Sequence, residues 1–234
     1  ISVTVSSASV LTMIDTDKSF QERYEQIIKT TAEDQIKEFE LVDAWEDGLN
    51  YWVYYQLSKE RYRQIKEEEK RNAVALASDF FDRAQQSEKD GLRIQAIRYY
   101  FQAFRSVENY LADAIKISRE GSDILLVNEI YGSIQRLLNL IDLSVYPSQI
   151  VVNRRVRISD QPIILSTTFR DDVGIASGVP VKATFRKGSG DVFPTYKTNE
   201  QEQAKILLSN ITSRDVEQTI EVTCDLDELS NLSE

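Results

Sequence analysis

The sequence predicts a multidomain α+β protein in which a strand, helix and hairpin unit is followed by an antiparallel helical module and an all-β sandwich. Apolar and polar residues alternate at the start of the chain and again after residue 149, which is the period of β-strands. From residue 59 to residue 142 the apolar period becomes about 3.6 residues, as in amphipathic helices. The predicted units are residues 1–58, 59–146 and 149–234, with a seam near position 147.

The first unit opens with a predicted strand, because Val3 and Val5 alternate with small polar residues. A helix is predicted over residues 19–35, where Ser19 and Glu22 have the spacing of a capping box. The unit ends in a predicted hairpin. One alternative is that residues 1–58 form only part of a domain.

The hairpin is predicted from two apolar runs, residues 38–46 and 50–57, on either side of Asp47-Gly48. An Asp-Gly pair readily takes the two positive φ angles of a two-residue turn. A turn centred on this pair places Ala44 opposite Tyr51 and makes both faces of the hairpin apolar. Each face therefore needs a cover, either from other parts of the chain or from a partner.

One face of this hairpin is the candidate interaction surface. Its aromatic residues are Phe39, Trp45, Trp52 and Tyr54. Aromatic rings stack on sugars and on the apolar surfaces of partner proteins, but they are also common in cores. The sequence leaves these readings open, and core packing by residues 60–142 is the more frequent outcome.

The second unit is predicted to contain three antiparallel helices. Ser58 is a plausible N-cap for the first, Asp90-Gly91 ends it, and Gly121-Ser122-Asp123 separates the second from the third. The predicted inward stripes are Ala73, Leu76, Ala77, Phe80, Phe81 and Ala84; Leu92, Ala96, Tyr100, Ala103, Val107, Leu111 and Ala114; and Val127, Ile130, Ile134, Leu137, Leu138 and Ile141.

The third unit is predicted to be a β-sandwich, because five to seven short alternating runs are separated by turn residues. The predicted inward rows are Ile163, Leu165, Thr167 and Phe169; Val179, Val181, Ala183 and Phe185; Ala204, Ile206 and Leu208; and Ile220, Val222 and Cys224. Cys224 is therefore predicted to be a buried, inert thiol.

Composition excludes several kinds of chemistry. The chain has no histidine, one cysteine and a formal net charge of −10. Without histidine or a second cysteine, there is no Ser-His pair, no CxxC pair and no structural zinc site, so we predict no catalytic residue, cofactor or metal. The acidic turns at 171–172 and 225–228 leave a calcium ion as a minor alternative. The negative charge also weighs against nucleic acid as a partner.

Two segments resemble known repeats and domains. The spacing of Ala84, Gly91, Ala96, Tyr100 and Ala103 resembles one tetratricopeptide repeat, which implies close packing of two helices. The run 178–190 and the segment 195–208 resemble an invasin-type bacterial immunoglobulin-like domain, with its "G-x-P-V" strand and "T-(N/D)-x-x-G-x-A" hairpin. Glu202 stands where that hairpin has its glycine.

The opening segment also resembles a known family. The strand 2–9, Trp45 and the run 51–59 are similar to the C-terminal part of the small bacterial twenty-kilodalton lipoprotein family. That resemblance implies export to the periplasm or outer membrane, attachment through a lipid on an N-terminal cysteine upstream of Ile1, and no catalysis.

Together these observations predict a non-catalytic bacterial cell-envelope protein with a structural or protein-binding role. Its expected partner is another envelope protein, and its only expected membrane contact is the upstream lipid anchor. The alternatives are a glycan-binding or adhesive surface protein and an accessory part of a larger envelope enzyme.

Overall fold

The computed structural model describes residues 2–7, 40–46, 51–56, 58–119, 121–152 and 163–231. The predicted helix over 19–35 and the predicted strand residues 153–158 lie outside this part of the chain. Helices and mostly antiparallel sheets both occur in the described residues, so the predicted α+β class is confirmed.

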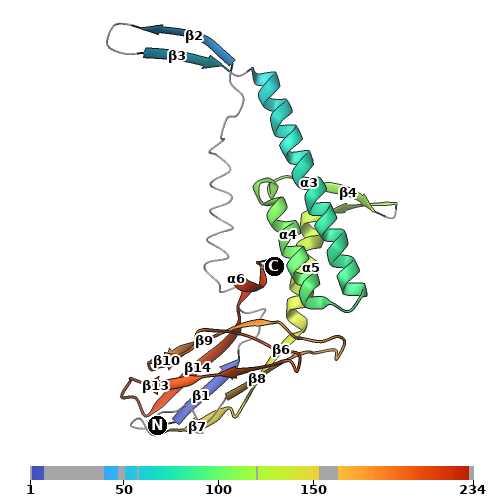
Figure 1. Ribbon diagram of the computed structural model, residues 1–234. Coiled ribbons are helices and arrows are strands. Elements are labelled where there is room, and N and C mark those ends of the chain that lie inside the picture. The colour runs from blue at the N-terminus through green and yellow to red at the C-terminus, as the bar shows by residue number, and fades with distance from the viewer. Residues whose placement is uncertain are drawn as a thin grey trace.

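Figure 1 shows how the elements are arranged: three helices stand on one end of a β module, and a hairpin lies beyond the start of the longest helix. The hairpin consists of β2 (Glu40–Glu46) and β3 (Tyr51–Gln56). The helices are α3 (Lys59–Lys89), α4 (Arg93–Ser106) and α5 (Leu126–Leu140). None of the described helices combines the length and apolar character needed to span a lipid bilayer.

The start and the end of α3 follow the sequence prediction. The Ser58 side chain accepts a hydrogen bond from the backbone N–H of Arg61 at 3.0 Å, which satisfies a donor at the free end of the helix. At the other end, Gly91 has a φ of +78°, a conformation that glycine takes without steric cost. The chain then reverses, and α4 packs against α3.

The predicted inward stripes of α3 and α4 are buried or half-buried over residues 73–107, except at two leucines. Leu76 is 50% exposed and Leu92 is 53% exposed. Ala77, the next residue after Leu76, is fully buried in α3, and Leu92 is the N-cap residue that precedes α4.

The segment between α4 and α5 differs from the prediction. Helix α4 ends at Ser106, so Leu111 and Ala114 do not continue its stripe. A 3-10 turn, η1 (Glu108–Tyr110), leads into a small hairpin of β4 (Lys116–Arg119) and β5 (Ser122–Leu125). Ile117 and Ile124 lie opposite each other in this hairpin, and both pack against the core. This packing favours a strand over a helix in the segment.

The β module begins earlier than predicted. Strand β6 (Ile141–Tyr146) starts directly after α5 and pairs with β8 (Ile163–Phe169) along its whole length. Ile141, predicted as the last inward residue of a helix, is the first residue of a strand and remains buried. The turn from helix to strand therefore falls at residue 141, before the expected seam at 147.

The β module contains one five-stranded sheet and two smaller ones. The strand orders are β11-β9-β14-β1-β7, β12-β8-β6 and β10-β13. The remaining strands are β1 (Ser2–Ser7), β7 (Gln149–Val151), β9 (Pro180–Lys187), β10 (Gly190–Val192), β11 (Thr195–Lys197), β12 (Gln203–Ile206), β13 (Leu208–Ile211) and β14 (Glu217–Cys224), and β14 leads into the four-residue helix α6 (Leu226–Leu229).

Strand β1 lies in this C-terminal sheet. It pairs parallel with β14 and antiparallel with β7. The strand predicted at the start of the chain is therefore present, but its neighbours come from the last third of the sequence. The prediction placed β1 in the same unit as the hairpin, residues 1–58, because the two are close in the sequence. The strands that pair with β1 are more than 140 residues away in the sequence.

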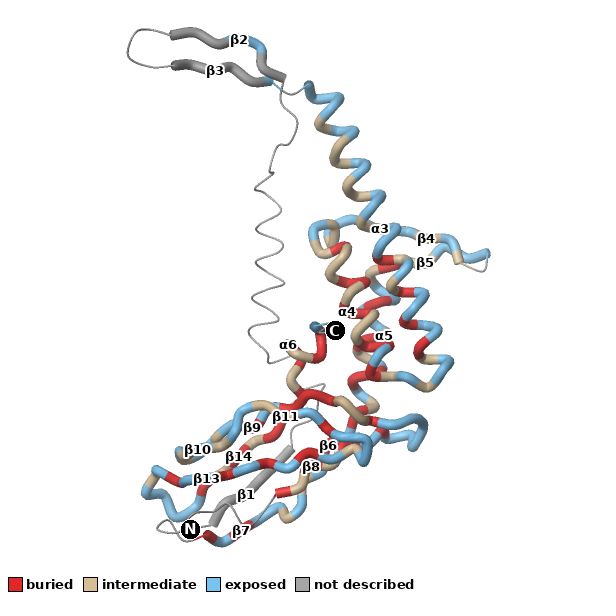
Figure 2. Tube along the Cα trace, viewed as in Figure 1, coloured by how far each residue is buried: buried red, intermediate tan, exposed pale blue. Residues whose placement is uncertain are grey.

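The core runs through both halves of the molecule. The predicted inward rows of β8, β12 and β14 are buried, and Phe185 of β9 is half-buried (Figure 2). The buried residues of the helices and of the β module belong to one apolar cluster, which includes Ile141, Leu143 and Ile150. No break in this cluster separates the two modules near position 147 within the described residues.

Candidate interaction sites

The hairpin register differs from the sequence prediction. Glu46 pairs with Tyr51 and Trp45 pairs with Trp52, so the strands are joined by residues 47–50 instead of a two-residue Asp47-Gly48 turn. The predicted pairing of Ala44 with Tyr51 is therefore wrong by two residues. The Asp47-Gly48 dipeptide indicated the position of the hairpin correctly, but it did not predict the register of the two strands.

The corrected register brings three of the four candidate positions together. Trp45 lies opposite Trp52, and the next pair on the same face is Asp43 with Tyr54. A bulge at Val42 shifts the pairing before this point, so Leu41 pairs with Tyr55. Phe39 lies outside the described residues, as do the side chains of Trp45, Trp52 and Tyr54.

The first part of α3 extends from the helical module toward the hairpin (Figure 1). None of the residues from Ser58 to Asn72 is buried. Two contacts within the helix support its first turns, since Arg63 pairs with Glu60 at 2.5 Å and Gln64 donates to the same carboxylate at 3.4 Å. We call residues 58–68, together with β2 and β3, the arm.

The arm is anchored where α3 reaches the rest of the helical module. Lys70 forms an ion pair of 2.7 Å with Asp113, which follows η1. Further along, the Arg119 guanidinium of β4 donates to Ser78 at 2.6 Å and to Asp82 at 2.8 Å. These contacts attach α3 to the segment after α4 and determine the direction in which the arm leaves the body.

A polar network that starts at the buried Tyr100 and ends at the exposed Arg136 links the three helices. The Tyr100 hydroxyl of α4 donates to Glu88 Oε1 of α3 at 2.6 Å, and Arg136 Nη2 of α5 donates to both oxygens of Glu88 at 2.8 and 2.7 Å. Burial, together with the bond to Glu88, raises the pKa of the Tyr100 hydroxyl well above its usual value. Tyr100 therefore stays a neutral donor.

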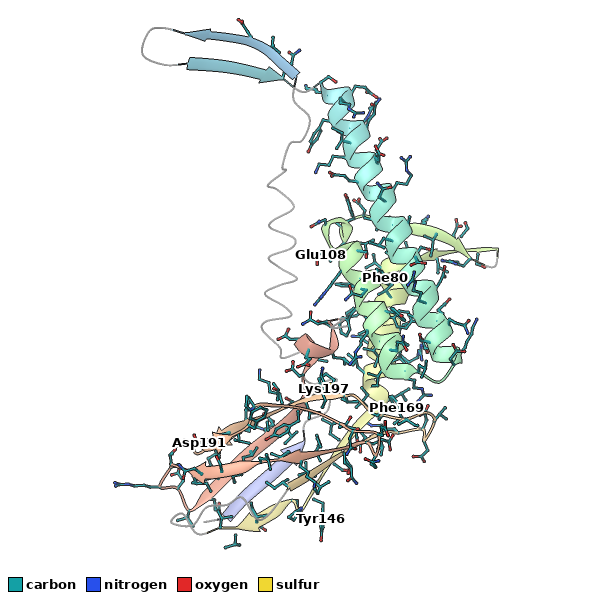
Figure 3. The ribbon with its side chains drawn as sticks, in the orientation of Figure 1. Phe80, Glu108, Tyr146, Phe169, Asp191 and Lys197 are labelled. Atoms are coloured by element: carbon teal, nitrogen blue, oxygen red, sulfur yellow. The ribbon has the colours of Figure 1, made fainter. Side chains whose placement is uncertain are left out.

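The helical module is bonded to the β module through α4. Arg93 forms two parallel hydrogen bonds with Asp171, at 2.6 and 2.8 Å, and its guanidinium lies 5.0 Å from the centre of the Phe169 ring. Phe169 is buried at the end of the β module that faces the helices (Figure 3). The bond to Asp171 raises the pKa of Arg93, and the same bond lowers the pKa of Asp171.

Hydrogen bonds with buried threonines and with Glu202 fix Ala176 in the loop that carries Asp171. Thr167 and Thr198 both donate to the Ala176 carbonyl, at 2.6 and 3.1 Å. The Ala176 N–H donates to Glu202 Oε1 at 2.6 Å. Glu202 has a φ of +60°, a left-handed backbone conformation that glycine takes more readily than other residues do.

The end of the chain also contacts α4. Arg105 Nη2 donates to the Ser230 hydroxyl at 2.8 Å and to Asn231 Oδ1 at 3.1 Å, and Gln102 donates to the Ser230 carbonyl at 3.3 Å. Asp225 caps α6 by accepting from the Glu228 N–H at 3.1 Å. With the Arg93 contact and a hydrogen bond of 3.3 Å from Arg98 to the Gly178 carbonyl, α4 is attached to the β module at three places in the described residues.

An exposed apolar patch lies on the β module. Phe193 is 60% exposed and meets Tyr196 edge to face, with ring centres 5.7 Å apart. The Tyr196 hydroxyl accepts a hydrogen bond from the Leu207 N–H at 2.9 Å, and Leu207 is itself exposed. This patch was missed by sequence reasoning, because the three residues come from separate runs with no common period.

The described residues contain no group of three histidine, cysteine, aspartate or glutamate side chains that could hold a metal ion. The acidic turns considered for calcium have other roles, since Asp171 pairs with Arg93, Asp225 caps α6 and Glu228 pairs with Lys197 at 2.7 Å. Cys224 is fully buried as predicted, and burial raises the pKa of its thiol to about 12.

Comparison of the chain with protein-family models, with curated proteins and with solved structures finds no match.

Proposed function

We propose that this chain is a non-catalytic, protein-binding component of the bacterial cell envelope and that it presents the arm to its partner. The observation that carries the proposal is the first part of α3, which leaves the body, buries no residue between Ser58 and Asn72 and reaches the hairpin. Helices in proteins gain most of their stability from packing one face against other structure, so a partner surface that covers the arm would stabilise it.

The body behind the arm is suited to presenting it in one orientation. Contacts of Arg93 with Asp171, of Arg98 with Gly178 and of Arg105 with Ser230 attach α4 to the β module. The Tyr100, Glu88 and Arg136 network ties α3 to α4 and α5. A binding element held by a rigid scaffold loses less freedom on association than a free peptide does.

The surface charge of the arm favours a protein partner. Exposed residues of both signs alternate there, including Lys59, Glu60, Arg63, Glu67 and Glu68. Nucleic acids and anionic membranes instead attract clusters of basic residues, and the whole chain has a net charge of −10. Opposite charges on a protein surface can match such a mixed pattern and fix its register.

The finer assignments are part of the same proposal. In it, the β module is an immunoglobulin-like sandwich that serves as a spacer, and α3 with α4 is a repeat-like packing unit. Placement in the periplasm or at the outer membrane, with a lipid anchor upstream of Ile1, is supported by the lipoprotein-like residues of the first segment. Fractionation of the tagged full-length gene product in its bacterium tests this placement, and recovery in the cytosolic fraction would contradict it.

Site-specific photocrosslinking tests the binding role of the arm. A benzophenone amino acid replaces Gln64 in the arm or, as a control, Asn128 on α5, and both positions are exposed. We expect position 64, but not position 128, to form a saturable adduct with one protein that unlabelled chain competes away.

Charge reversal checks that the adduct depends on the arm surface. The pair Lys59→Glu and Glu68→Lys should reduce the adduct at least tenfold at unchanged net charge. The matched pair Lys89→Glu and Glu129→Lys, on exposed positions of the body, should not. Equal labelling from positions 64 and 128, or no competable adduct from position 64, contradicts the proposal.

A glycan-binding role is the second candidate, because the hairpin register places Trp45 opposite Trp52 with Tyr54 as the next position on that face. Aromatic residues arranged in this way can stack on successive sugar rings. Saturable glycan-array binding that is lost in both Trp45→Ala and Trp52→Ala, without a protein adduct from position 64, would favour this candidate over the first.

A further inference from the structure

One side of the first part of α3 is exposed over about three helical turns. Its exposed polar residues, which we call the charged face, are Glu60, Arg63, Gln64, Glu67, Glu68 and Arg71. They share one side of the helix because they recur at intervals of three and four residues. The residues of α3 that are buried in the body, Ala77, Phe81 and Ala84, come later in the helix. The charged face is therefore open to another molecule.

The charges of this face are symmetric about a midpoint between residues 65 and 66. Arg63 lies as far before the midpoint as Glu68 lies after it. Glu60 and Arg71 are related in the same way, with the acidic residue first. Reversing the direction of the helix thus exchanges each of these charges for its opposite.

A face with this symmetry fits a second copy of the same helix lying antiparallel across it. A two-fold axis through the midpoint places each arginine of one copy opposite a glutamate of the other. Gln64 then lies opposite Glu67, to which its amide can donate a hydrogen bond. Each contact occurs twice because of the symmetry, so no charge of the face is left opposite a like charge.

Other arrangements of two such helices bring like charges together. A parallel pair in register sets Arg63 and Glu67 each against the same residue of the other copy. An antiparallel pair shifted by four residues places Glu60 opposite Glu67, or Glu67 opposite Glu68. Like charges in contact oppose association, so the charge pattern selects one orientation and one register.

The charged groups are available for contacts with another molecule. Glu67, Glu68 and Arg71 have no ion-pair partner within the part of the chain that the structure describes. Arg63 pairs with Glu60 of its own helix, but these side chains are 65% and 61% exposed, so the contact contributes little and is readily exchanged.

We propose that the charged face binds a second copy of the chain, so that two α3 helices pair antiparallel about the midpoint in a symmetric dimer. This inference rests on the proposed function, because the charged face includes the exposed helix of the arm, and it adds the identity of the partner. Exposed ion pairs are weak one by one and are screened by salt. The dimer therefore forms at high protein concentration and dissociates as the salt concentration rises.

A charge exchange in the purified full chain tests the proposal by sedimentation velocity. Arg63→Glu places two glutamates opposite each other, and Glu68→Arg places two arginines opposite each other. Each variant alone should associate at least fivefold more weakly than the unaltered chain. In an equimolar mixture the glutamates of one variant face the arginines of the other, so the mixture should recover the association of the unaltered chain.

The matched controls make the same changes of net charge on exposed positions of the β module. They are Arg214→Glu and Glu200→Arg. Each control variant alone should associate like the unaltered chain, because neither position belongs to the charged face.

Crosslinking with a short bismaleimide reports the orientation. In the antiparallel pair, Glu60→Cys of one copy lies opposite Arg71→Cys of another, whereas two copies of Glu60→Cys hold their thiols about 16 Å apart along the helix axis. A mixture of the two variants should therefore link at least fivefold more than either variant alone. The natural Cys224 is fully buried and does not compete.

The proposal is overturned if the unaltered chain stays monomeric at every concentration in low salt. It is also overturned if Arg63→Glu and Glu68→Arg associate as well as the unaltered chain, or if their mixture recovers nothing. Links among copies of Glu60→Cys that equal those of the mixture would show a parallel pair and overturn it too. A purified chain that stays monomeric, yet gives a competable adduct from position 64 with a different protein, overturns the dimer and leaves the proposed function standing.

Discussion

Arg93 and Asp171 form a two-point ion pair between the start of α4 and the loop after β8, with N to O distances of 2.6 and 2.8 Å. The planar guanidinium matches both carboxylate oxygens and at the same time covers the face of the buried Phe169. One arginine therefore contributes both a polar bond and an apolar contact to the joint between the helices and the sheets.

Replacing Asp171 with asparagine is expected to lower the stability of the protein at neutral pH, and the loss should vanish in acid. The hydrogen bond from Arg93 lowers the pKa of the Asp171 carboxyl, so the stabilisation is fully present above the unfolded value of about 4 and disappears as pH falls through the folded value. Urea midpoints of both proteins from pH 7 to pH 2.5 measure this. The neighbouring Asp172→Asn, which keeps the bond between Arg93 and Asp171, is the control.

Tyr100→Phe is expected to destabilise the fold by about 1–2 kcal/mol, because it removes a buried hydroxyl that donates to the charged Glu88. The control is Tyr99→Phe on the next residue, whose hydroxyl accepts an exposed bond of 3.2 Å from Gln95. That variant should change the free energy of unfolding by less than about 0.5 kcal/mol. Equal effects in denaturant titrations would show that the Glu88 network contributes little.

Glu202→Ala is expected to cost about 1–3 kcal/mol, since the buried Ala176 N–H loses its acceptor while the backbone at 202 keeps its positive φ. Glu200→Ala, two residues earlier at an exposed position, should be nearly neutral. Thermal unfolding of the two variants makes the comparison. A Glu202→Ala protein as stable as the parent would mean that water or another group replaces the carboxylate.

Cys224 is expected to resist thiol reagents in the native protein. Its thiol is fully buried and its pKa is raised to about 12, so the reactive thiolate is scarce at pH 8. Labelling with a coloured disulfide reagent should be at least a hundredfold faster in denaturant than without it. Rapid labelling of the folded chain would show that this end of β14 opens easily.

The sequence by itself determined those features that depend on neighbours along the chain. The N-cap at Ser58 and the helix break at Gly91 follow from the chemistry of single residues. The buried rows of β8, β12 and β14 follow from a two-residue period that any half-buried strand must show. The candidate aromatic positions of the hairpin could be named in the same way, because an Asp-Gly pair indicates a nearby chain reversal.

Only the tertiary structure decided which elements are neighbours. The β1 to β14 pairing joins residues more than 200 positions apart, and the alternating pattern of β1 is the same for every possible partner strand. The start of β6 at Ile141 depended on pairing with β8, since an apolar residue at this position fits both the end of a helical stripe and the start of a buried strand. Local patterns specify which face of an element is apolar, whereas the pairing and register of distant strands depend on the free energy of the whole packed core.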